Sequence, residues 1–171
     1  KAVERLGCPF HALEGVPTVH CEGTNEVAEE YRALHGLDTR PPEGTRFYSG
    51  AWGEAYAVDQ DRAADSLLAQ AIQGVDFPKT VRQAYDDGVR IFLEMGPGGS
   101  CARMIHKILD GVPFRAHSIS SATQDEPSAV LRALGMLIAE RVPVDLAQLY
   151  PGGSLVEHES GPVTRIPVGQ A

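Results

Sequence analysis

One segment constrains the fold of this chain more than any other: an apolar run followed at once by a cluster of glycines. Residues 89–95 (VRIFLEM) form the strongest candidate strand, and Gly96-Pro97-Gly98-Gly99 separates them from an amphipathic helix expected over residues 100–109. A further short strand is expected over residues 114–118. A strand, a crossover helix and a second strand form a right-handed unit on a parallel sheet. We therefore predict an α/β fold.

Periodicity and turn residues predict the other elements. Helices are expected over residues 25–36, 59–73, 78–87 and 125–141, and short strands over residues 10–20, 46–49 and 54–57. Thr24 or Asn25 is expected to cap the first of these helices. Two helices should bury an apolar face, formed by Ala63, Leu67 and Ala71 in the second and by Val130, Leu131, Leu134, Leu137 and Ile138 in the last. Residues 143–171 are rich in Pro and Gly and are expected to form a linker.

The charge and the cysteines exclude several classes of protein. The 171 residues carry 15 basic and 23 acidic side chains, a net charge of −8, so a nucleic-acid binder is not expected. No apolar run approaches the roughly 18–20 residues of a membrane span. Three cysteines without CxxC spacing exclude a disulfide framework and a cysteine zinc site, and they favour the reducing cytoplasm. The six histidines lack i,i+4 pairing, so no metal site is predicted.

The glycine segment 96–99 is open to three interpretations. Its main-chain amides could bind a phosphate at the start of the following helix, although the Lys-Ser/Thr of a P-loop is missing. Residues 98–102 (GGSCA) approach a nucleophile elbow, in which Ser100 would need His106 or His117 as its base. In the third and favoured interpretation, the glycines allow a tight turn from strand to helix, and Ser100 caps that helix.

His20 and Glu94 are the other candidates for chemistry. His20 follows an apolar segment just before a predicted helix, and a histidine at the carboxyl end of a strand faces the crevice where α/β proteins bind ligands. A structural histidine with satisfied hydrogen bonds is an equal alternative. Glu94 lies within the apolar run FLEM, and a buried carboxylate needs hydrogen bonds. A structural clamp on the glycine turn is favoured over a general base.

Several short motifs occur in a fixed order along the chain. They are His20-Cys21, Phe47-Tyr48-Ser49, residues 66–70 (SLLAQ), residues 75–77 (VDF), residues 88–98 (GVRIFLEMGPG), residues 133–137 (ALGML) and residues 142–146 (VPVDL). This order resembles the C-terminal half of a malonyl-CoA:acyl-carrier-protein transacylase-type acyltransferase domain, as in polyketide and polyunsaturated fatty acid synthases. The resemblance implies that residues 1–19 end a small ferredoxin-like subdomain. Residues 20–120 would then form the C-terminal part of a large parallel-sheet, hydrolase-like subdomain, and residues 121–171 a following helix and linker.

The resemblance also implies roles for particular residues. His20 corresponds to the catalytic histidine of the family, and Gln70 to the residue whose main-chain carbonyl orients that imidazole. Gly96, Pro97 and Gly98 correspond to a turn that shapes the floor of the substrate site. Val19 stands where related sequences carry a selectivity motif, and its intermediate size leaves the choice of acyl unit open.

The function implied by the resemblance is transfer of a malonyl-type acyl group from CoA to the phosphopantetheine thiol of an acyl carrier protein, through a serine ester. The chain would bind no cofactor of its own. Its partners would be malonyl-CoA or a related acyl-CoA, the carrier protein, the preceding half of the domain and flanking synthase domains. In family order the nucleophilic serine precedes Lys1, so we expect a longer parent chain and no activity from these residues alone. The alternatives are an interaction element, in which residues 125–141 and 143–171 dock flanking domains, and a serine hydrolase using Ser100.

Overall fold

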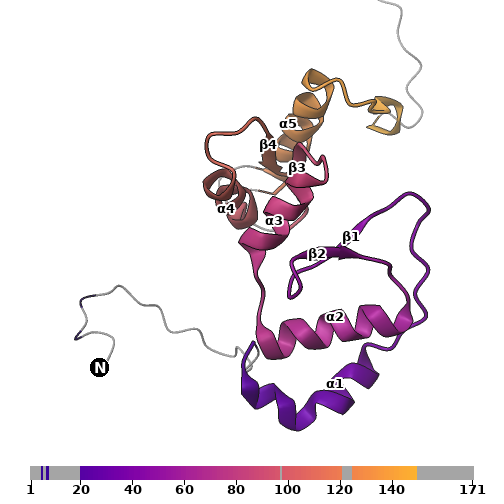
Figure 1. Cartoon of the computed structure of the whole chain (residues 1–171). Helices are drawn as coiled ribbons and strands as arrows, with labels where there is room; N and C mark the ends of the chain where they lie inside the picture. The colour runs from indigo at the N-terminus through magenta and orange to yellow at the C-terminus, as the bar shows by residue number, and fades with distance from the viewer. Residues whose placement is uncertain (1–4, 6, 8–19, 97, 121–124, 150–171) are drawn as a thin grey trace, which may run out of the picture.

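The computed structural model describes Arg5, Gly7 and residues 20–96, 98–120 and 125–149 (Figure 1). Val19, Pro97, the predicted strand before His20 and most of the predicted linker therefore lie outside the described residues. The elements in chain order are η2 (Glu22–Val27), α1 (Ala28–Leu34), β1 (Phe47–Ser49), β2 (Glu54–Tyr56), α2 (Gln60–Gln73), α3 (Phe77–Asp86), β3 (Ile91–Glu94), α4 (Ser100–Ile108), β4 (Arg115–Ser118), α5 (Glu126–Ala139) and η3 (Leu146–Leu149).

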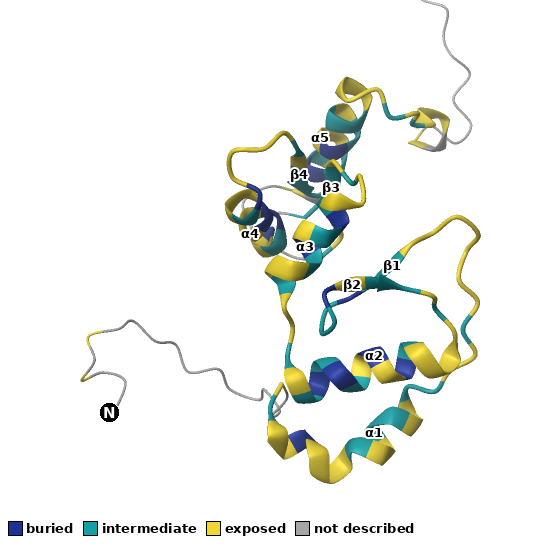
Figure 2. Cartoon of the chain, in the orientation of Figure 1, coloured by how far each residue is buried: buried dark blue, intermediate teal, exposed yellow. Residues whose placement is uncertain are grey.

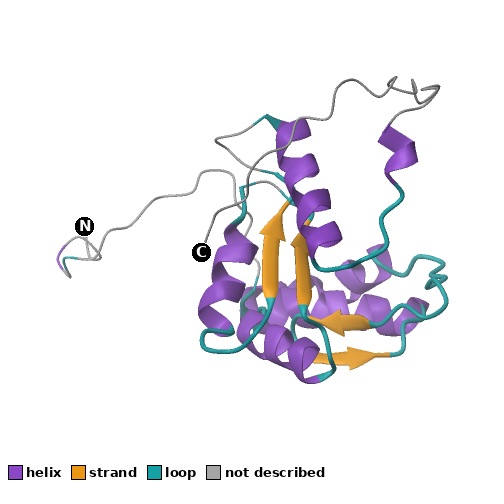
Figure 3. Cartoon of the chain, turned by 90° about the horizontal axis from the view of Figure 1, so that it is seen from above, coloured by secondary structure: helices purple, strands orange, loops and turns teal. Residues whose placement is uncertain are grey.

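The elements form two groups that α3 connects. α1 packs with α2, and the antiparallel hairpin β1–β2 is joined to α2 by a hydrogen bond between Ser66 and Ser49, whereas α4 and α5 pack with the pair β3–β4 (Figures 1 and 3). α3 contacts both the hairpin and α4. β3 and β4 are parallel, with Ile91 opposite Arg115 and Glu94 opposite Ser118, and α4 is the crossover between them. The mixed α/β class and the parallel crossover are confirmed.

The apolar core lies where α3 and α4 meet the parallel strands. Val81, Ile105 and Leu109 are buried there, and Phe92 and Phe114 pack against them from the strands (Figure 2). Burial of apolar surface stabilises this contact by about 25 cal/mol per Å². The core therefore packs β3 against α3 and α4.

The predicted apolar faces of α2 and α5 are correct only in part: Ala71 is buried as expected, but Leu67, Leu131 and Ile138 are exposed. In α2 the buried residues include Ala64 and Ala69, while Leu67 is 39% exposed. In α5 Ala129 and Ala133 are buried, while Leu131 is 54% exposed and Ile138 is 48% exposed. Both helices turn their alanines toward a neighbouring element, because a small side chain permits close approach of the two backbones. Hydrophobic periodicity gives leucine more weight than alanine, so it predicted that these leucines would lie on the buried face.

Aspartates begin three of the helices. Asp59, Asp76 and Asp125 each accept the main-chain N–H of the residue three positions later, which satisfies one of the free donors at the helix start. The predicted cap of the first helix is wrong, because Thr24 is buried inside η2 and no side chain caps α1. β3 is also shorter than predicted, because the amide of Val89 still donates to the carbonyl of Ala84 at the end of α3.

Asp125→Asn should remove part of the pH dependence of stability. The pKa of Asp125 is lowered because its carboxylate accepts the main-chain N–H of Ser128. Its ionised form therefore stabilises the fold above about pH 4, the range of a free aspartate, and this contribution is lost as the pH falls through the lowered pKa. Asparagine keeps the cap without the charge. In urea unfolding, the difference in stability between wild type and variant should shrink below about pH 4.

The control for this measurement is Asp110→Asn, an exposed carboxylate that caps no helix. A stability difference between wild type and Asp125→Asn that stays constant from neutral to acidic pH would contradict the prediction.

Candidate functional site

His20 is anchored at the C-terminal end of α2. Its ring Nδ1 lies 2.6 Å from the main-chain oxygen of Gln70, and its main-chain N–H donates to the oxygen of Ala71 at 2.7 Å. Both oxygens belong to the last four carbonyls of the helix, which have no partner within the helix itself. The strand predicted to end at His20 lies outside the described residues, and within the described part of the chain the end of α2 holds His20 in place.

The bond to Gln70 fixes the tautomer of the imidazole. A carbonyl oxygen can only accept a hydrogen bond, so Nδ1 carries the proton of the ring. In the neutral ring Nε2 then has a lone pair, and the His20 side chain is exposed. The C-terminal end of a helix carries a partial negative charge, which favours a cation beside it. The arrangement suits a group that accepts a proton at Nε2.

The backbone at His20 has an uncommon conformation. Its φ of 65° lies in the left-handed region, and Arg141 is the other non-glycine residue with a positive φ among those described. A non-glycine residue in this region costs roughly 1–3 kcal/mol, and such residues are enriched at functional sites. The Gln70 carbonyl also accepts the N–H of Gly74 at 3.1 Å, so it serves both the helix end and the imidazole.

The Glu94 side chain clamps the start of α4. Its two carboxylate oxygens accept the main-chain N–H groups of Cys101 and Ala102 at 3.2 and 2.8 Å. The clamp predicted for Glu94 is therefore confirmed. The predicted cap by Ser100 is wrong: the N-cap is Gly99, with a φ of 74° and no side-chain cap bond. A carboxylate already bound to the free amides disfavours a phosphate at the same place.

Among the described residues, no base is hydrogen-bonded to Ser100. Ser100 is exposed at the first position of α4, and no hydrogen bond connects it to His106 or His117 in the described part of the chain. The Nε2 atom of His106 instead lies 3.3 Å from the oxygen of Ala116. This geometry gives no support to the interpretation of Ser100 as a nucleophile.

The glycine turn and His20 belong to different groups of elements. Gly96 and Gly98 follow β3, whereas His20 is bound to α2. A hollow of about 650 Å³ lies beside the turn and is lined by Phe77, residues 91–96, Ser100, Cys101 and Ile105. Among the described residues no hydrogen bond joins the turn to His20.

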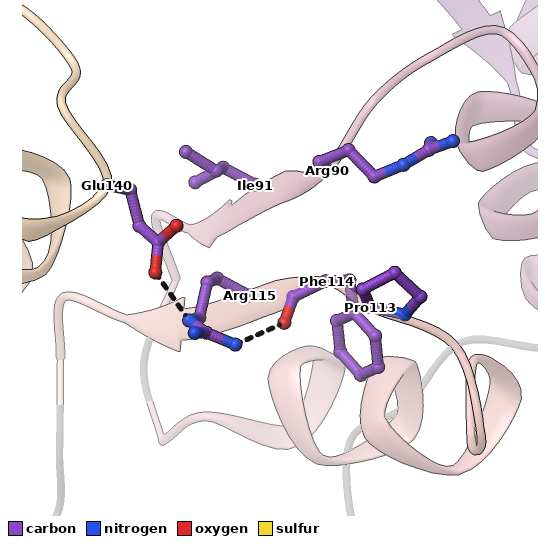
Figure 4. Close-up of a pocket in the computed structure, with 6 residues that line it drawn as sticks. All are labelled: Arg90, Ile91, Pro113, Phe114, Arg115 and Glu140. Carbon is purple, nitrogen blue, oxygen red and sulfur yellow. Dashed lines mark hydrogen bonds and ion pairs between the residues drawn. The ribbon is translucent and has the colours of Figure 1, made fainter.

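A second hollow, of about 450 Å³, lies at the opposite end of β3 and β4 (Figure 4). The Arg115 guanidinium donates to the Glu140 carboxylate at 2.6 Å, and Ile91, Pro113 and Phe114 form apolar walls. The Arg90 side chain turns away from this ion pair in Figure 4 and stacks over Tyr85. The hollow lies beside the amino ends of the strands, away from the turn at their carboxyl ends.

Sequence reasoning did not single out every group that holds the histidine. The carbonyl of Ala71, which binds the His20 amide, is a main-chain group, and any residue type supplies it. Buried hydroxyls at Ser49 and Ser66 were also missed.

The described residues contain neither a metal-binding cluster nor a membrane-spanning helix. No three His, Cys, Asp or Glu side chains are grouped so that they could hold a metal ion. No helix in this part of the chain has both the length and the apolar character needed to cross a bilayer.

Known proteins similar to this chain are polyketide synthases, although no family model matches it. The chain is 30% identical to the polyketide synthases GfsB and GfsA of Streptomyces halstedii, over 130 and 149 residues. These matches cover 75% and 86% of this chain and 2% of each relative. It is also 32% identical over 130 residues to the phthioceranic/hydroxyphthioceranic acid synthase of Mycobacterium tuberculosis, which covers 73% of the chain and 6% of that synthase.

Solved structures locate the similarity within one domain of these synthases. The acyltransferase domain from the second module of the salinomycin polyketide synthase superposes with a TM-score of 0.68 at 22% identity, over 90% of this chain and 37% of that one. The malonyl CoA-acyl carrier protein transacylase of Clostridium perfringens gives 0.62 at 23% identity, over 86% and 43%. The chain thus spans well under half of each solved structure. It belongs to the acyltransferase-domain family of polyketide synthases and comprises part of such a domain.

Proposed function

We propose that this chain supplies the histidine of an acyltransferase that moves a malonyl-type acyl group from CoA to the phosphopantetheine thiol of an acyl carrier protein. One observation carries the proposal: Nδ1 of His20 lies 2.6 Å from the main-chain oxygen of Gln70, with the rest of the ring exposed. This is the pairing that the family resemblance implies for these two residues. The nucleophile, a serine hydroxyl, would come from a preceding part of the same domain.

In the first half-reaction His20 acts as a general base. A serine hydroxyl is a poor nucleophile at neutral pH, so Nε2 takes its proton as the oxygen attacks the thioester carbonyl. The carbon–sulfur bond of the thioester then breaks, and the imidazolium returns the proton to the CoA sulfur. The products are a serine ester and CoA thiol. The Gln70 carbonyl holds the imidazolium through Nδ1–H during this step.

The second half-reaction uses the same groups in reverse. Nε2 takes the proton of the phosphopantetheine thiol as its sulfur attacks the serine ester. The ester carbon–oxygen bond breaks, the serine oxygen recovers the proton from the imidazolium, and the acyl group leaves on the carrier protein. One histidine suffices because each half-reaction begins with the same neutral tautomer.

The preceding half of the domain would cover surface that this chain leaves open. β4 is the one partner of β3 among the described strands, so no described strand pairs with the main-chain donors and acceptors at the other edge of β3. Leu93 and Met95 beside it are 38% and 74% exposed. Added polypeptide that pairs with this edge would extend the parallel sheet into the larger hydrolase-like subdomain.

The malonyl-type substrate is inferred from similarity. The Clostridium relative is named as a malonyl CoA-acyl carrier protein transacylase, and the SpnD acyltransferase domain was solved with a substituted malonyl group at 21% identity to this chain. The roles proposed for Val19 and for residues 96–98 in shaping the acyl site have the same basis. CoA would carry the acyl group on the substrate, and phosphopantetheine would accept it on the partner protein. The chain itself would therefore bind no cofactor.

A second candidate function is a docking element for flanking synthase domains. The exposed side chains of Leu131 and Ile138 lie two turns apart on the outer face of α5, and Leu146 and Leu149 of η3 are also exposed. Exposed apolar residues grouped in this way are typical of an interface. This function and acyl transfer are compatible within one parent protein.

The test compares these residues alone with the complete acyltransferase domain that contains them. Each protein is incubated with malonyl-CoA and then with the phosphopantetheinylated carrier protein, and the acyl groups on both are followed by intact-mass spectrometry. The complete domain should form a serine ester and pass it to the carrier, and the 171 residues alone should do neither. A complete domain that forms no acyl-enzyme from any acyl-CoA would refute the proposal.

A further inference from the structure

A buried pair of serine hydroxyls connects the β1–β2 hairpin to α2. The Ser66 hydroxyl donates to the Ser49 hydroxyl at 2.7 Å, and the two residues are 2% and 0% exposed. The same Ser49 oxygen accepts the main-chain N–H of Trp52 at 3.3 Å. Buried hydroxyls are costly unless they are paired, so this bond fixes how the helix and the hairpin sit against each other.

The pair lies one helical turn from Gln70, the residue whose carbonyl binds His20. Ser66 precedes Gln70 by four residues, so the two lie one turn apart on the same side of α2. On the hairpin, Gly50 follows Ser49, and a Cβ placed on Gly50 would lie 3.4 Å from the side-chain oxygen of Gln70. The Gly50 carbonyl also accepts the N–H of Asp76 at 2.8 Å, just beyond the end of α2.

We infer that Ser49 and Ser66 are positioning residues for the His20 imidazole, and this inference rests on the proposed function. The hydrogen bond between their hydroxyls fixes how α2 is rotated and shifted along its axis relative to the hairpin. That placement determines where the Gln70 carbonyl meets Nδ1 of His20, which it does at 2.6 Å. Neither serine touches the reacting atoms. A shift of about 1 Å at a site of this kind can lower a rate by up to a hundredfold.

The test measures kinetics and the imidazole itself in Ser66→Ala. In the complete domain we expect kcat to fall about tenfold with KM for acyl-CoA unchanged, because the chemistry is misaligned while substrate contacts remain. In ¹⁵N NMR spectra of the 171-residue chain, the His20 Nδ1–H resonance should move or broaden. Ser128→Ala, which changes a serine of α5 far along the chain, should change neither quantity.

A double variant separates positioning from simple stabilisation. Ser49→Ala with Ser66→Ala removes both hydroxyls and should regain part of the stability that Ser66→Ala loses, because the Trp52 N–H also loses the Ser49 oxygen that accepts it. The inference requires kcat to stay low in this double variant. It is overturned if kcat recovers together with stability, or if Ser66→Ala leaves kcat and the His20 resonance unchanged. Loss of activity in His20→Ala with normal Ser66→Ala kinetics would reject this inference alone, whereas normal His20→Ala kinetics would reject the proposed function.

Discussion

Replacing His20 by alanine should lower acyl transfer by the complete domain about a thousandfold, the middle of the range for a lost general base. The variant removes the atom that takes the serine proton and returns it to the CoA sulfur. It also removes the bond to the Gln70 carbonyl, but that carbonyl still accepts the N–H of Gly74. Folding should therefore survive, and the loss should appear in kcat with little change in KM.

The chain offers a matched control for this substitution. Nδ1 of His35 lies 2.7 Å from the main-chain oxygen of Tyr31, nearly the same geometry as at His20, and the ring packs against Tyr31. His35→Ala thus removes an equivalent hydrogen bond at the end of α1, a helix end that has no role in the proposed reaction. Transfer rates should remain near wild type in His35→Ala. Equal losses in both variants would indicate a folding defect and contradict the assigned role of His20.

The sequence predicted correctly those helices and strands whose ends are marked by turn glycines or capping aspartates. The hairpin around Gly50–Gly53 and the helices that begin after Asp59 and Asp125 are found close to their predicted positions. The first helix, expected to begin at Thr24 or Asn25, starts as a 3₁₀ turn without a side-chain cap. Local capping residues are informative where they are used, and tertiary contact replaces them elsewhere.

Burial was predicted less well, for a different reason. Ala64 and Ala69 are buried in α2 while Leu67 is partly exposed, because close packing against neighbouring elements favours small side chains. Ser66 is buried because Ser49, 17 residues earlier, supplies a partner for its hydroxyl. A pairing between distant residues of this kind leaves no periodic pattern in either segment.

The candidate site also contains one contact that the sequence predicts locally and one that it does not. The clamp by Glu94 follows from its own position, because a carboxylate within an apolar run next to a helix start has amides within reach. The pairing of His20 with Gln70 cannot be predicted from either residue's position. Any residue type supplies a main-chain carbonyl, and the two residues are 50 positions apart. Only the order of motifs along the whole chain pointed to that pair.

Glu94→Ala should destabilise the protein by about 2 kcal/mol, since two hydrogen bonds to a charged acceptor are lost at once. The amides of Cys101 and Ala102 would lose their carboxylate partner, and the positive end of α4 would lose a compensating charge. The melting temperature should fall by roughly 6 °C for a protein of this size. Differential scanning calorimetry measures the change.

Two companion variants of Glu94→Ala distinguish the clamp from a general effect of charge. Glu54→Ala removes an exposed carboxylate from β2 and should shift the melting temperature by less than about 2 °C. Glu94→Gln keeps the shape of the side chain but leaves one oxygen for the two amides, because its NH₂ group faces the second N–H as another donor. Its stability should fall between those of wild type and Glu94→Ala. A Glu94→Gln variant as stable as wild type would mean that the charge and the second acceptor contribute nothing, and the glycine turn would then be held by the β3–α4 packing alone.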